Sequence, residues 1–360
     1  MNPAPIAATD AMRQLHEFDA VIDARSPAEY ADDRLPGAVN WPVLDDDERR
    51  AVGTAYAQVS AFEARKRGAA HIARRIADLL DAHVRDKPKD WRPLVYCWRG
   101  GKRSGTLAWF LAEIGFRTQV LDGGYKAFRA AVLAELASLP ARFRYRVICG
   151  RTGSGKTRLL GALAAAGAQV LDLEALACHR GSVLGALPGR PQPTQKAFDT
   201  HVWHALSRFD PARPVYVESE SAKVGNLRVP EALIARMRMH GHCIVVELPD
   251  AARVDLLRAD YRHFVDDAEG FCRQLDALVE LRGREVVQGW QRLAREGRWA
   301  DVFVDLMHRH YDPIYLRSMR ANFRGFGDAE LLALLDASPA KLADAARRLM
   351  MAEDQSSPAR

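Results

Sequence analysis

The sequence predicts an α/β protein with two parallel-sheet domains, the second of which continues into a helical extension. Short apolar segments alternate with helical segments, as in a parallel sheet whose strands are joined by helices. This alternation stops near Pro140 and begins again at Tyr145. From about Ala251 onward the pattern is almost wholly helical and rich in arginine. We therefore predict one domain over 1–140, a second over 141–325 that includes the arginine-rich helices, and a C-terminal helical tail over 326–360.

Apolar spacing and turn residues predict the individual elements. In the first domain we expect strands at 18–24, 93–97 and 118–121, and a turn at 35–40 that leads into a short strand. We expect helices that begin at Ser26 or span 69–82, 105–114 and 130–137. In the second domain we expect strands at 145–149, 169–173, 215–218 and 243–248, and a helix at 156–166.

Composition narrows the class of protein. The net charge of +6 and the pI of about 9.1 are compatible with a phosphate-rich partner but do not identify one. The five cysteines are scattered and form no CxxC pair, which argues against a disulfide framework and a structural zinc site. The N-terminus does not resemble a secretory signal, and no apolar run approaches the length of a membrane span. We therefore expect a cytoplasmic protein.

The first candidate site is a cysteine at the head of a basic, glycine-rich loop. A predicted buried strand ends on Cys97, at the sheet edge where open α/β proteins bind ligands. The following residues are Trp98, Arg99, Gly100, Gly101, Lys102 and Arg103, and a helix comes next. The glycines allow N–H groups to point inward, while the helix N-terminus and the basic side chains favour a thiolate. We predict that Cys97 is a nucleophile and that the loop binds an anion.

A cysteine at a strand end is usually a core residue. At Cys97 the adjacent glycine pair and three basic residues favour the functional interpretation. The other cysteines lack such a setting: Cys149 and Cys243 fall in apolar strands, and Cys272 falls in a helical run. Cys178 lies beside His179 without further ligands, so a metal site there is not expected.

The second candidate site is a phosphate-binding loop. Residues 150–157 match the pattern GxxxxGK[ST], with an apolar strand before them and a helix after them. In such a P-loop, backbone N–H groups wrap a diphosphate, the lysine reaches its terminal oxygens, and the hydroxyl can bind Mg²⁺. The predicted diphosphate-binding residues are Gly150, Gly153, Ser154, Gly155, Lys156 and Thr157. The pattern does not distinguish ATP from another diphosphate.

Four acidic residues are candidates for an acid or Mg²⁺ ligand beside this loop. Glu218 follows an apolar strand and has Glu220 behind it, whereas Asp172 and Glu174 are weaker candidates. For each of them, a surface or helix-capping role competes with metal binding. We expect no tightly bound cofactor, with Mg²⁺ as a possible ion.

The chain resembles a known family. Residues 22–30, 35–40, 97–105 and 121–125 are similar to a rhodanese domain. A rhodanese domain joined to a P-loop domain within 360 residues resembles the bacterial tRNA 2-selenouridine synthases. Residues 41–49, 52–54 and 97–104 extend this likeness, which covers nearly the whole chain and is densest before about residue 225.

The resemblance implies a two-step tRNA modification. Members of this family attach a geranyl group from geranyl diphosphate to the sulfur of wobble 2-thiouridine. They then replace the geranylated sulfur with selenium from selenophosphate. Cys97 matches the family's catalytic cysteine, which is taken to carry selenium as an S-selanyl intermediate. The P-loop is implied to serve geranyl diphosphate rather than ATP hydrolysis.

A tRNA partner would need a basic surface. The arginine-rich segments at 253–262, 282–298 and 309–324 are candidates, with interleaved aromatic residues Tyr261, Trp290, Trp299, Tyr311, Tyr315 and Phe323. An ordinary helical bundle with aromatic residues in its core explains the same pattern and is preferred for any single residue.

Three other functions compete with the two-step modification. A rhodanese-type sulfurtransferase with an accessory nucleotide-binding domain explains Cys97 but leaves the P-loop idle. A P-loop kinase with an inert rhodanese module explains Lys156 but not the intact cysteine loop. A nucleotide-switched RNA-binding protein would not require Cys97. Two intact motifs in one chain favour a chemistry that uses both.

Overall fold

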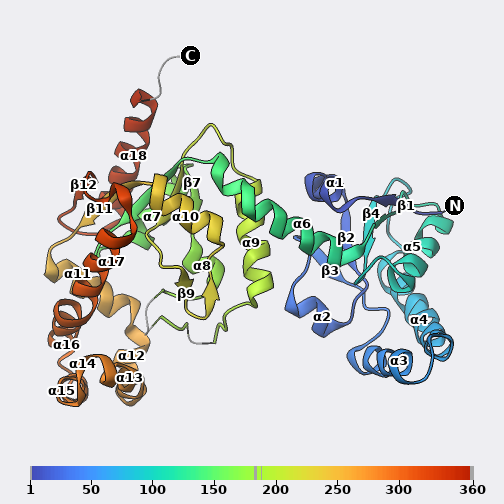
Figure 1. The fold of residues 1–360 in the computed structure, drawn as a ribbon, viewed down its shortest axis with the longest axis horizontal. Coiled ribbons are helices and arrows are strands. Elements are labelled where there is room, and N and C mark those ends of the chain that lie inside the picture. The colour runs from blue at the N-terminus through green and yellow to red at the C-terminus, as the bar shows by residue number, and fades with distance from the viewer. Residues whose placement is uncertain (1, 182–184, 188, 357–360) are drawn as a thin grey trace. The chain divides into compact units, whose positions relative to one another are not determined.

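The computed structural model describes residues 2–181, 185–187 and 189–356, and Figure 1 shows its ribbon. The chain divides into an N-terminal unit, Met1–Leu136 with Pro193–His204, and a C-terminal unit, Ala137–Gln192 with Ala205–Arg360. Among the described residues, no helix combines the length and the apolar character that a membrane span requires.

The N-terminal unit is built on a five-stranded parallel sheet in the order β1-β5-β4-β2-β3. The strands are β1 Ala4–Ile6, β2 Ala20–Asp23, β3 Ala38–Asn40, β4 Pro93–Tyr96 and β5 Gln119–Leu121. The helices are α1 Ala8–Arg13, α2 Pro27–Asp32, α3 Asp46–Gln58, α4 Ala61–His83, α5 Lys102–Ile114 and α6 Gly124–Ser138. The sequence analysis did not predict β1 or α3.

Local sequence explains where these helices begin. Ser26 and Glu29 form a capping box with Pro27 in the first turn of α2, so both ends of the first turn are hydrogen-bonded. Asp45 and Glu48 do the same for α3. The apolar stripe of α4 packs on the sheet in a core that also contains Val95 of β4 and Leu107 of α5. This core fixes β4 and α5, the two elements that flank the cysteine loop.

The C-terminal unit contains a second five-stranded sheet, in the order β12-β11-β6-β8-β7, with every pair parallel. The strands are β6 Tyr145–Cys149, β7 Gln169–Leu171, β8 Val215–Glu218, β11 His242–Glu247 and β12 Glu330–Ala333. A two-stranded hairpin, β9 Lys223–Val224 and β10 Leu227–Arg228, lies outside this sheet. The central strand of the five-stranded sheet, β6, runs directly into the P-loop and the helix α7 Lys156–Ala165.

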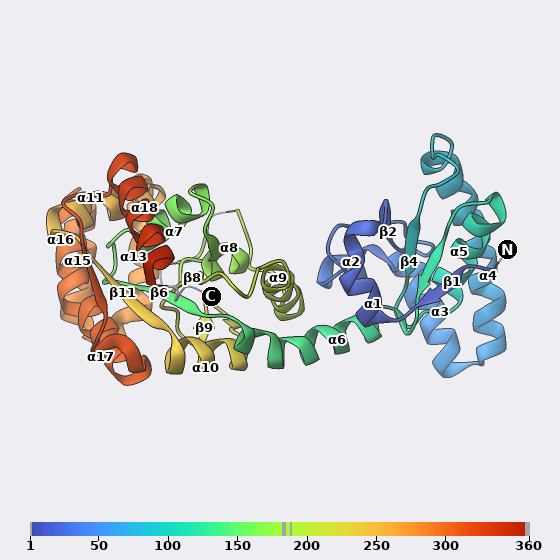
Figure 2. The same ribbon diagram turned by 90° about the horizontal axis from the view of Figure 1, so that it is seen from above.

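A helical group follows β11 and has its own core. It comprises α11 Asp250–Asp260, α12 Arg262–Asp266, α13 Ala268–Leu275, α14 Val279–Arg282, α15 Arg284–Arg295, α16 Trp299–Leu306 and α17 Asp312–Asn322. Figures 1 and 2 show α13, α15 and α16 gathered in orange at one end of the unit. Phe271, Trp290 and Phe303 are buried in this core. The predicted helical extension is therefore present.

The segment predicted as a helical tail, 326–360, has a different role in the described structure. It supplies the edge strand β12, which pairs with β11 over Ile244–Glu247. Helix α18 Pro339–Ser356 then packs on the sheet together with α7, burying Leu342, Ala346 and Leu349. Because these apolar residues complete the sheet's core, the segment belongs to the second domain. The overall α/β fold class with two parallel sheets is confirmed.

The remaining helices of the chain are short or connect the strands. They are α8 Leu173–Ala177, α9 Gln195–Ser207 and α10 Glu231–His240. Most of α9 lies in the segment Pro193–His204, which groups with the N-terminal unit. The sequence analysis did not predict this assignment.

Candidate functional site

Cys97 follows the last residue of β4 and is buried in the core of the N-terminal unit, with 3% of its surface exposed. The Ser104 hydroxyl donates a hydrogen bond to Cys97 Sγ over 3.1 Å. Gly101 occupies the N-cap of α5, so the loop 97–101 ends at the positive end of that helix dipole. The predicted arrangement of strand, cysteine, loop and helix is therefore present.

The backbone of the next loop fixes the cysteine loop from one side. The Tyr125 N–H donates to the Cys97 carbonyl over 2.8 Å, and the Lys126 N–H donates to the Trp98 carbonyl over 3.0 Å. Gly124 has φ of +59°, and a Cβ there would lie 2.4 Å from the Cys97 oxygen and 2.5 Å from the Gly100 nitrogen. Only glycine permits this approach, which explains the Gly-Gly pair at 123–124.

Side-chain contacts hold Tyr125 in place. Its hydroxyl donates to the Asp33 carboxylate over 2.8 Å, and the Thr200 hydroxyl of α9 donates to the same carboxylate over 2.9 Å. The Arg25 guanidinium lies 4.1 Å from the centre of the Tyr125 ring and forms a buried ion pair with Asp23. Burial raises the pKa of Asp33 despite these hydrogen bonds. The support of the cysteine loop therefore reaches across the sheet to β2 and α9.

The cations of the cysteine loop differ in their availability. Arg99 and Lys102 are exposed to solvent. Arg103 instead forms an ion pair with Glu29 at 2.5 Å, and Arg49 lies 3.7 Å from the same carboxylate. Burial opposes ionisation of Glu29, but the hydrogen bond and charge of Arg103 lower its pKa overall. Arg99 and Lys102 are thus the loop cations with the most open access to an incoming anion.

The P-loop connects β6 to α7, as its sequence pattern predicts. Gly150, Gly153 and Gly155 all have positive φ values, of 154°, 76° and 81°. A Cβ on Gly150 would lie 2.3 Å from Ser154 Oγ, so the loop closes on itself tightly. Lys156 Nζ donates to the Gly150 carbonyl over 3.0 Å. The lysine therefore folds back across the loop and places its positive charge beside the loop backbone.

Distant residues lock the P-loop in place. The Gly150 N–H donates to the Tyr315 hydroxyl of α17 over 2.5 Å. The guanidinium of Arg253, in α11, donates to the Thr152 carbonyl over 2.9 and 2.7 Å. The same guanidinium pairs with the Asp312 carboxylate over 2.6 Å. None of these contacts has a local sequence signal.

Several residues of the candidate tRNA-binding segments lie in the core. Arg253, in the candidate segment 253–262, is fully buried and supports the P-loop, as the preferred helical-bundle interpretation allows. Trp290, Trp299 and Phe323 are also buried. Tyr315 is held at the P-loop. For these residues, the ordinary helical-bundle interpretation is the right one.

Three glutamates meet beside the P-loop. The carboxylates of Glu174, Glu218 and Glu220 lie within 4.8 Å of one another. Burial and the neighbouring negative charges raise the pKa of Glu174 to about 9 and that of Glu220 to about 7. Burial also raises the pKa of Glu218, although the charge of Lys156 and a hydrogen bond from Thr157 oppose this. Such a cluster must hold either protons or a cation.

The donor set suits a divalent cation. Among the residues that the structure describes, Glu218 Oε1 is buried without a hydrogen-bond partner, and so is Ser154 Oγ. Carboxylate and hydroxyl oxygens are the ligands that Mg²⁺ prefers. Glu174, a weaker candidate in the sequence, belongs to the cluster because β7 and β8 are neighbours. Asp172 caps α8 by accepting from the Ala175 N–H over 2.8 Å, so the helix-capping alternative holds for that residue.

Comparison with known proteins gives two family matches along the chain. Residues 7–131 match the rhodanese-like domain, and residues 143–295 match the tRNA 2-selenouridine synthase AAA domain. A tRNA 2-selenouridine synthase from Aeromonas salmonicida is 31% identical over 362 residues, covering 90% of this chain and 95% of that protein.

Two further relatives, both tRNA 2-selenouridine synthases, align over a shorter span. The protein from Nitrosomonas europaea is 37% identical over 67% of this chain and 63% of its own length. The protein from Marinobacter nauticus is 33% identical over 67% of this chain and 65% of its own length. The chain thus spans slightly less than two thirds of these two relatives, and nearly all of the Aeromonas protein.

Proposed function

The chain belongs to the family of the tRNA 2-selenouridine synthases, and we propose that it converts wobble 2-thiouridine of tRNA into 2-selenouridine in two steps. We propose a cytoplasmic enzyme that uses geranyl diphosphate in the first step and selenophosphate in the second. The observation that carries the proposal is the pair of loops. Each follows a strand of a parallel sheet and precedes a helix, and their chemistries are complementary.

The first step belongs to the P-loop in this proposal. The sulfur of 2-thiouridine attacks C1 of geranyl diphosphate, the C1–O bond breaks, and diphosphate leaves with the electron pair. The loop N–H groups and Lys156 stabilise the charge of the departing diphosphate. Thr157 and Glu218 would hold Mg²⁺, which would neutralise further negative charge.

The second step belongs to the cysteine loop. Alkylation makes the sulfur displaceable: the selenium of selenophosphate attacks C2, the C2–S bond breaks, and geranyl thiol leaves after it takes a proton from solvent. Water then cleaves the Se–P bond and phosphate is released, which leaves selenium on C2. Selenophosphate is an anion, and Arg99, Lys102 and the N-terminus of α5 offer it positive potential. Cys97 lies at the head of this loop and is the residue that we assign to selenium handling.

The test is a nucleoside analysis of the complete reaction. Purified protein would be incubated with 2-thiouridine tRNA, geranyl diphosphate and selenophosphate, beside the variants Cys97→Ser and Lys156→Ala. We expect 2-selenouridine from the unaltered protein, geranylated thiouridine that accumulates in Cys97→Ser, and untouched thiouridine in Lys156→Ala. Unchanged thiouridine in every sample would reject the proposal, and thiosulfate sulfurtransfer would then be the activity to assay.

A further inference from the structure

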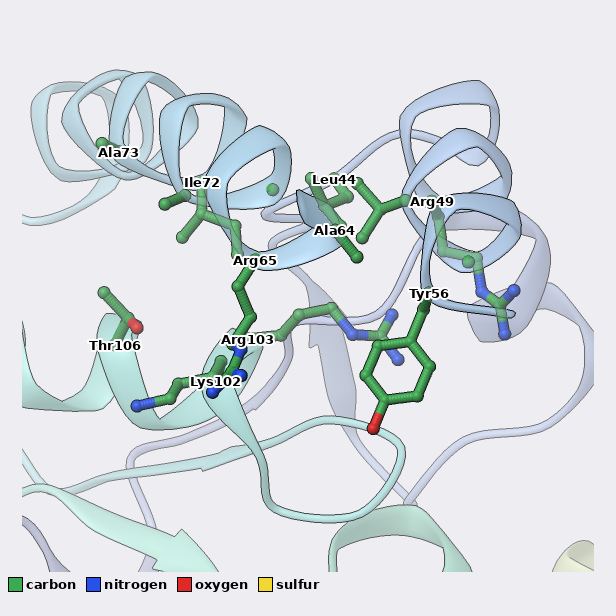
Figure 3. A pocket seen from close by; sticks show the side chains of 14 residues that line it. Leu44, Arg49, Tyr56, Ala64, Arg65, Ile72, Ala73, Lys102, Arg103 and Thr106 are labelled. Atoms are coloured by element: carbon green, nitrogen blue, oxygen red, sulfur yellow. The ribbon is translucent and has the colours of Figure 1, made fainter. Parts of the chain in front are cut away.

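An apolar pocket of about 550 Å³ lies in the N-terminal unit beside the start of α5. Its walls come from α3, α4 and α5, as Figure 3 shows. Much of the lining is aliphatic, from Leu44, Val52, Ala64, Gly68, Ala69 and Ile72. The reaction proposed above for Cys97 assigns no ligand to this pocket.

Positive side chains border the same pocket. Its lining includes the exposed Arg65 of α4 and Lys102 of α5, together with Arg49 and Arg103, which share Glu29 as an ion-pair partner. In Figure 3, Arg65 comes from α4, Lys102 and Arg103 come from α5, and Tyr56 comes from α3. An aliphatic interior with a cationic border matches a ligand that has an apolar chain and an anionic remainder. A free hydrocarbon would not use the border.

The pocket reaches the cysteine loop through the first turn of α5. Lys102 and Arg103 line the pocket, and the next residue, Ser104, hydrogen-bonds to Cys97 Sγ. A second hollow is lined by Gly100 and Gly101 of the cysteine loop and shares Lys102 and Thr106 with the pocket. A chain seated in the pocket is therefore anchored within one helical turn of the loop that holds the nucleophile.

We propose that this pocket holds the geranyl chain of the alkylated wobble base while selenium replaces its sulfur at the cysteine loop. The inference rests on the proposed function and assigns a chain-binding site to its second step. A cavity of about 150 Å³ is enough for a benzene ring, so the pocket has room for a ten-carbon chain. Its cationic border would face the RNA phosphates that accompany the base. The chain would thereby position its sulfur-bearing base, and geranyl thiol would leave into an apolar site.

The test narrows the pocket with Ala69→Trp. Ala69 and Ala70 are both exposed on α4, but Ala69 lines the pocket and Ala70 does not, so Ala70→Trp is the matched control. The substrates are two anticodon stem-loop RNAs, one with S-geranyl-2-thiouridine and one with S-methyl-2-thiouridine. We expect Ala69→Trp to lower the ratio of kcat/KM for geranyl over methyl by about tenfold or more. The control should retain the ratio of the unaltered protein.

The outcomes separate this inference from the proposed function. If the unaltered protein selenates the geranylated RNA and both tryptophan variants keep its ratio, the pocket assignment is wrong and the function stands. If the unaltered protein converts neither RNA, the proposed function is wrong. A geranyl probe with a photoreactive diazirine then tests the pocket alone. Labelling of α3 or α4 that Ala69→Trp abolishes supports a chain site, and labelling elsewhere, equal labelling in both variants or no labelling overturns it.

Discussion

The cysteine loop and the P-loop share a plan but are held in place differently. Both follow a strand of a parallel sheet, curl on glycines and enter the N-terminus of a helix. The cysteine loop is fixed by the backbone of 124–126, which follows it closely in the chain. The P-loop is fixed by side chains that lie 101 and 165 residues away, Arg253 and Tyr315.

The surroundings of the two loops differ in charge as well. Among the loop cations near Cys97, Arg99 and Lys102 are exposed and Arg103 is paired with Glu29. The P-loop instead faces a cluster of three glutamates with Lys156 beside it. One loop therefore suits an anion next to a nucleophile, and the other suits a diphosphate together with a cation. The comparison shows that two similar strand-loop-helix units can differ in chemistry because different side chains pack against them.

Removal of the buried guanidinium at the P-loop should have the largest effect on stability. Arg253→Met removes the nearest cation from the buried Asp312, whose other ion pair, with Arg151, is longer at 3.7 Å. We expect the free energy of unfolding to fall by about 3–5 kcal/mol. Chemical denaturation measures this change. Arg258→Met, at an exposed position of the same helix, is the control and should change stability by less than about 0.5 kcal/mol. If Arg253→Met weakened tRNA binding without changing the free energy of unfolding, Arg253 would instead be a residue that contacts RNA.

A methyl group at Gly124 tests how the cysteine loop is held. Because its Cβ would collide with the Cys97 carbonyl and the Gly100 nitrogen, Gly124→Ala should destabilise the protein by about 1–3 kcal/mol. Gly105→Ala is the matched control, since a Cβ there meets nothing within 4 Å and the residue lies inside α5. That control should be neutral or stabilising. Equal stability of the two variants, measured by thermal denaturation, would refute the backbone clamp.

The response to pH should be a smaller effect that originates at the P-loop. The pKa values of Glu174 and Glu220, about 9 and 7, lie above the ordinary value of 4.5. Between pH 4.5 and the raised pKa of each glutamate, the folded protein therefore binds more protons than the unfolded chain. The free energy of unfolding falls as the pH rises through this range. In metal-free buffer we expect the Tm to decrease from pH 6 to pH 9, and Glu174→Gln to flatten that decrease.

The exposed Glu280 supplies the control for this pH dependence. Glu280→Gln should leave the slope of Tm against pH as it is in the unaltered protein. A slope that Glu174→Gln does not change would mean that the acidic cluster is not the source of the pH dependence.

Local patterns were enough to predict both loops. The glycines, the cysteine and the lysine that define these two loops each lie in one strand-loop-helix stretch, so their spacing is visible in the sequence. The same holds for the starts of α2 and α3, where capping residues stand three positions apart. The positions of β4 and β6 were also predictable, because continuous apolar runs are typical of strands buried on both faces.

Contacts between distant segments could not be predicted in this way. Tyr315 and Arg253 look like ordinary members of arginine-rich helices until the fold brings them to the P-loop. Glu174 joins the acidic cluster only because β7 pairs with β8. The edge strand β12 overlaps the apolar run 331–335, which consists of leucine and alanine and suits a helix as well as a strand, so only its pairing with β11 identifies it as a strand. These features depend on tertiary packing, which a local sequence pattern does not predict.

The most direct test of the two-loop account bypasses the first step. RNA that already carries S-geranyl-2-thiouridine would be given to the unaltered protein, Lys156→Ala and Cys97→Ser, with selenophosphate as the only donor. The account predicts 2-selenouridine from the unaltered protein and from Lys156→Ala at similar rates, and none from Cys97→Ser. Failure of Lys156→Ala on this substrate, or selenation by Cys97→Ser, would contradict the division of the reaction between the two loops.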